Sequence, residues 1–270
     1  MQLNALMASQ FVLPSSPKVV ALLLSELESE QPDLKRICQL IGTDPSLTAR
    51  LLQLSNSGFF KLSGRIHSVA ESLALVGLKH VRTMAAAAAA GASLKAVPGI
   101  NLQRYWDFSL NVAKVSRSLA GVVRQNQQAA FTAGMIHCVG ELAMRMAMPL
   151  TLGALDEEAP PLDARRGRVE RKAFGYCYAQ VGAAYARKWL LPETIVDGLD
   201  QQDAPFADGA YEPMAGVLHL AAWRARCKDA GLNQREMAVT FPGTVGEVLS
   251  LDIDMVLQQD PIDWASARDA

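Results

Sequence analysis

The chain has 270 residues, 50% of them hydrophobic and 20% charged, which is the length and composition of one large globular domain or two small ones. Its formal net charge is −1, from 26 Lys and Arg against 27 Asp and Glu. The chain therefore lacks the overall positive electrostatic potential of a protein that binds nucleic acid or an anionic membrane by charge alone. The four cysteines form no CxxC pair, which argues against a disulfide scaffold or a zinc ribbon and favours reduced thiols.

The sequence predicts a soluble cytoplasmic protein. The first 15 residues contain no basic segment followed by an unbroken apolar run, so no signal peptide is expected. The longest apolar tract, Met84–Ala92, has nine residues, whereas a membrane-spanning helix requires roughly 20. We therefore expect no membrane association.

Helical spacing of apolar residues dominates the first hundred positions. Three successive stripes follow this spacing: Val20, Leu23, Leu24 and Leu27; Leu34, Ile37, Cys38 and Ile41; and Leu47, Leu51 and Leu54. Asp44 before Pro45 predicts a helix start, with Asp44 as the cap rather than a ligand. Gly77 is placed to end a short helix over residues 72–78.

A turn is predicted after the third stripe, over Ser55 to Gly58. Asn56 tolerates the left-handed conformation, and the serines and glycine around it favour a turn. The stretch is therefore interpreted as structural, with a polar binding site as the alternative. Arg50, on the preceding helix, is expected to orient a loop carboxylate or to face a partner.

Six consecutive alanines, residues 85–90, lack bulk on every side of the helix that they predict. Such a helix can approach its neighbours closely, so we expect it in the centre of a bundle. Val97, Pro98 and Gly99 end this helix and mark the main internal boundary of the chain.

A second set of helices follows. They are predicted over Leu102–Arg124, Gln128–Met148, Arg168–Trp189, Pro192–Gln202 and Glu212–Ala230, with polar connections at 150–167, 203–211 and 231–246. Because few stretches alternate as strands do, the predicted class is all-α. Residues 226–270 are expected to form a C-terminal extension, helical in part and packed back on the body.

One run in the first half is specific. Asp44-Pro45-x-Leu-Thr-Ala-Arg-Leu-Leu52 is followed by Ser55-Asn56-Ser57, and related segments continue through Tyr105–Ala120, Ala129–Met144 and Phe174–Leu199. In these motifs the chain resembles the HDOD domain, the HD-related output domain of bacterial signalling proteins, over residues 11–225. The resemblance implies a multi-helical bundle in two packed lobes, 11–97 and 100–225, which we expect to share one continuous core.

The resemblance also shows how to look for a catalytic site, because HD-type hydrolases hold metal ions with several His and Asp ligands around one cavity. The corresponding positions here are Phe108, His137, Cys138, Tyr178, Gln202, Asp203 and Ala222. Only His137 retains an expected ligand, so we predict no catalytic residue, metal or cofactor and no enzymatic activity. A substitute zinc site of His137, Cys138, Cys177 and an aspartate is chemically allowed, but the spacing does not specify it.

A basic cluster begins at residue 165. It contains Arg165, Arg166, Arg168, Arg171 and Lys172, interrupted by Glu170. We expect these side chains to form a solvated connector and helix face. An anionic partner surface is the alternative, and nucleic acid is disfavoured because no aromatic residue is interleaved with the charges.

Three functions are compatible with these observations. The leading hypothesis is a non-catalytic bacterial signal-transduction module that acts by binding another protein. The second is a sensor of a nucleotide second messenger, bound in a remnant cavity lined by His137, Gln202 and Asp203. The third and weakest is a residual metal-dependent phosphohydrolase.

Overall fold

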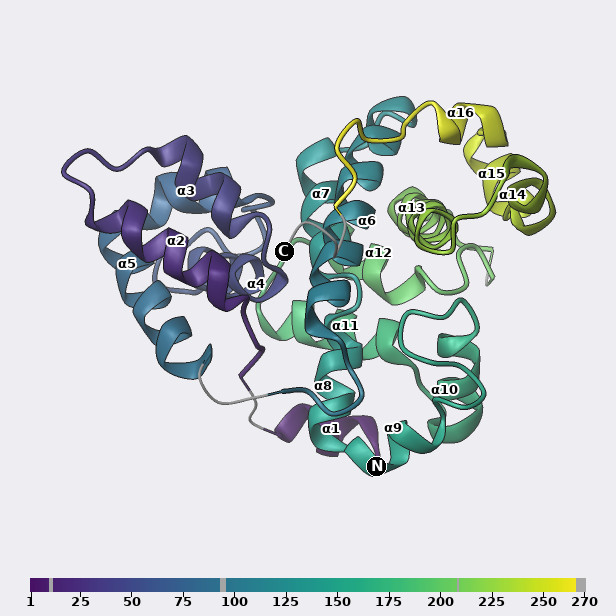
Figure 1. Ribbon diagram of the computed structural model, residues 1–270, viewed down its shortest axis with the longest axis horizontal. Helices are drawn as coiled ribbons and strands as arrows, with labels where there is room; N and C mark the ends of the chain where they lie inside the picture. The colour runs from purple at the N-terminus through teal and green to yellow at the C-terminus, as the bar shows by residue number, and fades with distance from the viewer. Residues whose placement is uncertain (10–11, 93–95, 208, 266–270) are drawn as a thin grey trace.

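The computed structural model describes residues 1–9, 12–92, 96–207 and 209–265, and within these ranges the chain forms helices joined by turns and loops, without a β-strand (Figure 1). The predicted all-α class is confirmed, as are two packed lobes. Lobe one, at the left of Figure 1, consists of α2 (Pro17–Glu28), α3 (Leu34–Ile41), α4 (Pro45–Ser55) and α5 (Val69–Ala92).

Lobe two contains the rest of the described chain. Its helices are α1 (Leu3–Ala8), α6 (Leu102–Val122), α7 (Gln127–Ile136), α8 (Val139–Ala147), α9 (Pro149–Ala154), α10 (Arg166–Phe174), α11 (Tyr178–Lys188), α12 (Glu193–Gln201), α13 (Pro213–Asp229), α14 (Gln234–Thr240), α15 (Gly243–Leu249) and α16 (Ile253–Leu257). The N-terminal helix α1 packs on lobe two, where the Tyr185 hydroxyl of α11 donates to the carbonyl oxygen of Leu6 at 3.2 Å.

Asp44 caps α4, as predicted. One carboxylate oxygen accepts from the backbone N–H groups of Ser46 at 2.9 Å and Leu47 at 2.8 Å. The other accepts from the backbone of Ser16 at 2.6 Å. Arg50 donates to the carbonyl oxygen of Leu13 at 2.9 Å. Both side chains therefore fasten the segment before α2 to α4, and Arg50 does so through a carbonyl rather than by orienting a carboxylate.

The expected turn after α4 forms, but its conformation differs from the prediction. Asn56 is buried and right-handed, with φ −86° and ψ −1°. Its side-chain amide donates to Leu52 O at 3.1 Å and to Ile66 O at 3.0 Å, while its oxygen accepts from Ile66 N at 3.2 Å. Asn56 therefore joins the two ends of the loop through its side chain, which supports the structural interpretation.

Helix α5 consists of two helical segments that meet at a kink. The non-helical backbone of Gly77, with φ 73° and ψ 162°, ends the first segment, as predicted. The alanine segment lies at the surface of lobe one, because Ala85 and Ala88 are buried whereas Ala86 and Ala87 are exposed. The prediction that this segment lies in the centre of the bundle is wrong, because only one face of the helix packs against neighbouring helices.

Within the described residues, α5 is also the one helix whose length and apolar composition, over Val69–Ala90, would suffice to cross a membrane. In this fold it packs against α2 and α4. Its residues Leu73, Val76 and Val81 belong to the buried core of lobe one.

Two of the long helices predicted in lobe two are each broken into a pair. The segment expected as 128–148 divides at His137 and Cys138 into α7 and α8. The segment expected as 168–189 divides at Gly175, a left-handed C-cap with φ 80°. Apolar spacing continues across both breaks, so periodicity alone did not reveal them.

The buried apolar residues form two clusters rather than the expected continuous core. One joins α2, α3 and α5 with part of α4. The other fills lobe two and includes Ala49 and Leu52 of α4, on the helix face that meets α7. Helix α4 therefore contributes side chains to both clusters.

The C-terminal helices pack against α13. The rings of Trp223 and Phe241 lie edge to face at 5.2 Å between centroids. Arg224 forms an ion pair with Asp260 at 2.5 Å. Residue 11, where the predicted domain begins, and residues 266–270, where the predicted extension ends, lie outside the described residues.

Candidate functional site

Five of the seven residues at the expected metal-ligand positions come together: Phe108 of α6, His137 and Cys138 between α7 and α8, Tyr178 of α11, and Gln202 after α12. The rings of Phe108 and His137 are 5.6 Å apart between centroids. The Gln202 amide donates to the carbonyl oxygen of His137 at 2.9 Å. Cys138 and Tyr178 line one small cavity beside this group. Ala222 is buried on α13 and adds no polar atom.

His137 is fully buried at the C-cap of α7. Its Nδ1 lies 2.7 Å from the carbonyl oxygen of Gly134, so the neutral ring carries its proton on Nδ1. Burial lowers the pKa of His137 to about 3, and the charge of Arg226 acts in the same direction. The imidazole is therefore neutral and oriented by the backbone of its own helix.

The cavity beside His137 has a volume of about 10 Å³. Its walls are Cys138, Glu141, Leu162, Asp163, Arg166, Tyr178 and Arg226. A space of this size holds about one water molecule. Burial raises the pKa of the Cys138 thiol, which keeps it protonated and a poor nucleophile.

These residues do not fit a catalytic metal. Arg166 and Arg226 balance the two carboxylates of the cavity wall, Glu141 and Asp163, so the wall offers no excess of negative charge to a divalent cation. Asp203 forms an ion pair with Arg171, and the Cys177 sulfur accepts from the same guanidinium at 3.1 Å. Among the described residues, no group of three His, Cys, Asp or Glu side chains is arranged to hold a metal ion. The substitute zinc set is therefore not brought together.

Arg226 is a residue of this site that the sequence did not reveal. It lies on α13, and its Nε donates to the carbonyl oxygen of Leu162 at 2.8 Å. Its guanidinium carbon is 6.0 Å from the centroid of the Phe108 ring. Because these partners are distant along the chain, no local motif identified Arg226 before the fold was known.

A buried cluster of charges adjoins the cavity and joins α8, α10 and the loop between them. Its members are Glu141, Arg145, Asp156, Arg166 and Glu170. Arg166 is 1% exposed and Glu170 is 0% exposed, so the expectation of a solvated face is wrong for both. It holds for Arg165 and Arg168, which are exposed. The i,i+4 spacing of Glu141 with Arg145 and of Arg166 with Glu170 was the available sequence signal.

Glu170 is the centre of this charge cluster. One oxygen accepts from Arg166 Nε at 2.8 Å, and the other accepts from the backbone N–H of Tyr178 at 2.7 Å. Burial and the neighbouring carboxylate of Glu141 raise the pKa of Glu170 to about 9. The cluster thus fixes the start of α11, which carries Tyr178 into the cavity wall.

Comparison with known proteins agrees with this architecture. The model of the HDOD domain family matches residues 13–205 of the chain. An uncharacterized protein of Treponema pallidum (strain Nichols) is 24% identical over 225 residues, which is 80% of this chain and 43% of that protein. The chain therefore covers less than half the length of this curated relative.

Two solved structures illustrate the range of similar folds. A fragment of the MmoQ response regulator from Methylococcus capsulatus strain Bath is 25% identical, with a TM-score of 0.70 over 91% of this chain and 94% of that one. A putative phosphohydrolase from Shewanella amazonensis SB2B is also 25% identical, with a TM-score of 0.53 over 92% and 90% of the two chains.

Proposed function

The chain belongs to the HDOD domain family, and from this premise we propose that it is a non-catalytic, cytoplasmic module of bacterial signal transduction that acts by binding another protein. The similar MmoQ fragment, which is described as a response regulator, supports a signalling role. The similar putative phosphohydrolase represents the competing function, hydrolysis of a phosphate ester. It would occur at the residues in the expected metal-ligand positions around His137 and Cys138, which we call the HD remnant.

One observation favours protein binding over hydrolysis of a phosphate ester. Beside His137, a cavity of about 10 Å³ is lined by Cys138 and Tyr178, by the cations Arg166 and Arg226, and by the carboxylates Glu141 and Asp163. A phosphohydrolase needs room for a phosphate and ligands that attract a cation. Here the cavity holds about one water molecule and its two carboxylates are balanced by two arginines, which favours a structural role for the HD remnant.

The same cavity is too small for a nucleotide, and the open cavity of about 300 Å³ beside it is lined by Phe108, Leu162 and Arg226 rather than by the predicted sensor residues His137, Gln202 and Asp203. Pockets for small molecules commonly measure about 300–1,000 Å³. His137 and Gln202 bind each other through backbone and side-chain atoms, and Asp203 is held by Arg171. Apart from His137 Nε2, which has no hydrogen-bond partner among the described residues, the polar groups named here bind within the protein.

The proposal is tested by complementation of a deletion strain of the source bacterium. His137→Asn and Cys138→Ser remove the imidazole and the thiol of the HD remnant and keep a polar side chain at each position. If the protein acts by contact, both folded variants restore the wild-type transcript profile and recover the same partner by crosslinking in cells. Far-ultraviolet circular dichroism and the thermal midpoint establish that each variant is folded.

Three results would overturn this function. Loss of complementation by both variants, with wild-type folding, would mean that the HD remnant performs chemistry. Purification of the chain with one metal ion bound, lost on His137→Asn, would mean the same. Failure of the wild-type chain to crosslink to any protein in cells would refute action by protein contact.

A further inference from the structure

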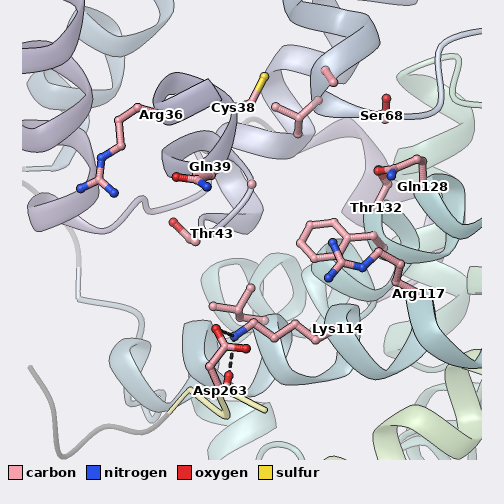
Figure 2. A pocket seen from close by; sticks show the side chains of 15 residues that line it. Arg36, Cys38, Gln39, Thr43, Ser68, Lys114, Arg117, Gln128, Thr132 and Asp263 are labelled. Atoms are coloured by element: carbon pink, nitrogen blue, oxygen red, sulfur yellow. Dashed lines mark hydrogen bonds and ion pairs between the residues drawn. The ribbon is translucent and has the colours of Figure 1, made fainter. Parts of the chain in front are cut away.

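A cleft of about 540 Å³ lies between the two lobes, far larger than the cavity at the HD remnant. We call it the interlobe cleft. On the lobe-one side it is lined by Arg36, Gln39 and Thr43, and on the lobe-two side by Lys114, Arg117 and Phe131 (Figure 2). Its volume lies within the range of roughly 300–1,000 Å³ that is usual for small-molecule sites.

The interlobe cleft is positively charged. Three cationic side chains, Arg36, Lys114 and Arg117, line it against one carboxylate, Asp263. Among the described residues neither Arg36 nor Arg117 forms an ion pair, and Lys114 pairs with Asp263 alone at 2.9 Å. This local excess of positive charge stands out in a chain whose net charge is −1, and it attracts an anion into the cleft.

The two sides of the cleft offer different chemistry. Lys114 and Arg117, one turn apart on α6, present cations suited to a phosphate group. Arg117 also lies over the Phe131 ring, 5.3 Å from its centroid. On the opposite side, Arg36 can stack on an aromatic ring and Gln39 can form hydrogen bonds with its edge.

Asp263 already places a carboxylate where a ligand phosphate would bind. The ammonium of Lys114 donates both to its side-chain oxygen at 2.9 Å and to its backbone carbonyl at 2.5 Å. Next to it, Asn111 exchanges two hydrogen bonds with Ala265, at 3.0 and 2.8 Å. The Asp263 side chain is 84% exposed, so its ion pair is weak and open to exchange.

From this arrangement we propose that the interlobe cleft binds a nucleoside phosphate, whose phosphate replaces Asp263 at Lys114 and Arg117 and whose base lies against the lobe-one wall. The ligand then bridges the lobes and frees the segment around Asp263 from α6. This site is separate from the HD remnant, and it is independent of whether the module acts by protein contact.

Isothermal titration calorimetry of the full chain with AMP, GMP, ADP and GDP tests the proposal, with adenosine, guanosine and inorganic phosphate as partial ligands. At least one nucleotide should bind saturably with a Kd below about 1 mM. The two nucleosides and inorganic phosphate should bind at least about ten-fold more weakly, because the nucleosides lack the phosphate group and inorganic phosphate lacks the base. Binding should weaken as NaCl rises from about 50 to about 300 mM.

Variants locate the site. Arg117→Gln should weaken nucleotide binding by about ten-fold or more, and Asp263→Asn should tighten it several-fold by removing the competing carboxylate. Lys35→Gln is the matched control, because Lys35 adjoins Arg36 on α3, is exposed and does not line the cleft. Its binding should equal that of the wild type.

Four outcomes would overturn the proposal. They are no saturable binding of any of the four nucleotides, equal binding of inorganic phosphate, binding unchanged by Arg117→Gln, or equal loss in Arg117→Gln and Lys35→Gln. Thermal midpoints of all variants show whether the fold is preserved. Because Arg117 is exposed and makes no ion pair with the described residues, we expect its replacement to leave the midpoint unchanged.

Discussion

The Nδ1 atom of His137 lies 2.7 Å from the carbonyl oxygen of Gly134, one turn earlier at the end of α7. In this bond the N–H group of the neutral imidazole donates to a carbonyl oxygen in the last turn of the helix. The ring is fully buried, and its Nε2 has no hydrogen-bond partner among the described residues. The one histidine retained from the HD ligand set is thus part of the helix end, and its protonation must oppose folding.

We expect His137 to make the protein less stable in mild acid. Its pKa is about 3 in the folded state, whereas the ordinary pKa of histidine is 6.5. Between these two pH values the unfolded chain therefore binds a proton that the folded chain does not. Stability is therefore complete above the unfolded pKa and is lost as pH falls through this window, at up to about 1.4 kcal/mol per pH unit. His137→Asn, which keeps a donor for Gly134, should reduce the loss between pH 6 and 5 by about 1 kcal/mol.

Urea unfolding at the two pH values measures this difference. His219 contributes loss of the same sign, because burial lowers its pKa as well, so some acid sensitivity should remain in His137→Asn. His80→Asn, a change at an exposed ring, is the control and should retain the full wild-type dependence. An unchanged slope in His137→Asn would contradict the prediction.

The buried charge cluster predicts a large effect at one arginine and a small effect at its neighbour. Arg166→Met removes the cation shared by Glu141, Asp156 and Glu170. Arg145 still pairs with Glu141 and Asp156, but the buried Glu170 loses its ion-pair partner. We expect a loss of about 3–5 kcal/mol in the free energy of unfolding.

Arg168→Met is the matched control, two residues away on the same helix but exposed. It should change stability by less than about 0.5 kcal/mol. Guanidinium chloride unfolding, followed by circular dichroism, compares the two. A loss below 1 kcal/mol in Arg166→Met would show that the cluster is not a stabilising unit.

Gly140 allows α8 to approach α11 at the HD remnant. A Cβ at this position would lie 2.7 Å from the backbone nitrogen of Gly182 and closer still to the carbonyl oxygen of Tyr178. Since both neighbours are backbone atoms, the helices must separate. Gly140→Ala should therefore cost about 3 kcal/mol or more.

Gly153→Ala provides the comparison, because a Cβ there meets no atom within 4 Å. This change should be neutral or slightly stabilising, since alanine favours a helix over glycine. Thermal midpoints of the two variants give the readout. Equal midpoints would mean that α8 and α11 are not held at this distance in solution.

Asn56 holds the loop between α4 and α5 through three hydrogen bonds. Asn56→Ala would leave the backbone N–H and carbonyl of Ile66 without these partners, and we expect a cost of about 2–4 kcal/mol. Gln53→Ala, at an exposed position of α4, should cost little. Hydrogen exchange should show faster exchange at Ile66 in Asn56→Ala, and unchanged exchange there would oppose this role.

The sequence by itself determined the helical class, the two lobes, the family resemblance and the cap at Asp44. These features depend on residues close together in the chain: apolar spacing, a capping side chain followed by Pro45, and short motifs. The assignment of HD-ligand positions to residues such as His137 and Cys138 rests on the motifs alone and stays a prediction. The motifs did not show which contacts these residues make in the folded protein.

Tertiary structure decided the rest. The breaks at His137 and Gly175 leave the apolar spacing intact, so they were invisible to periodicity. Whether Arg166 is solvated or buried depends on Glu141 and Asp156, which reach it from other segments. Burial, charge pairing and the shape of a cleft arise between residues distant in sequence, and only the packed chain fixes which of them meet.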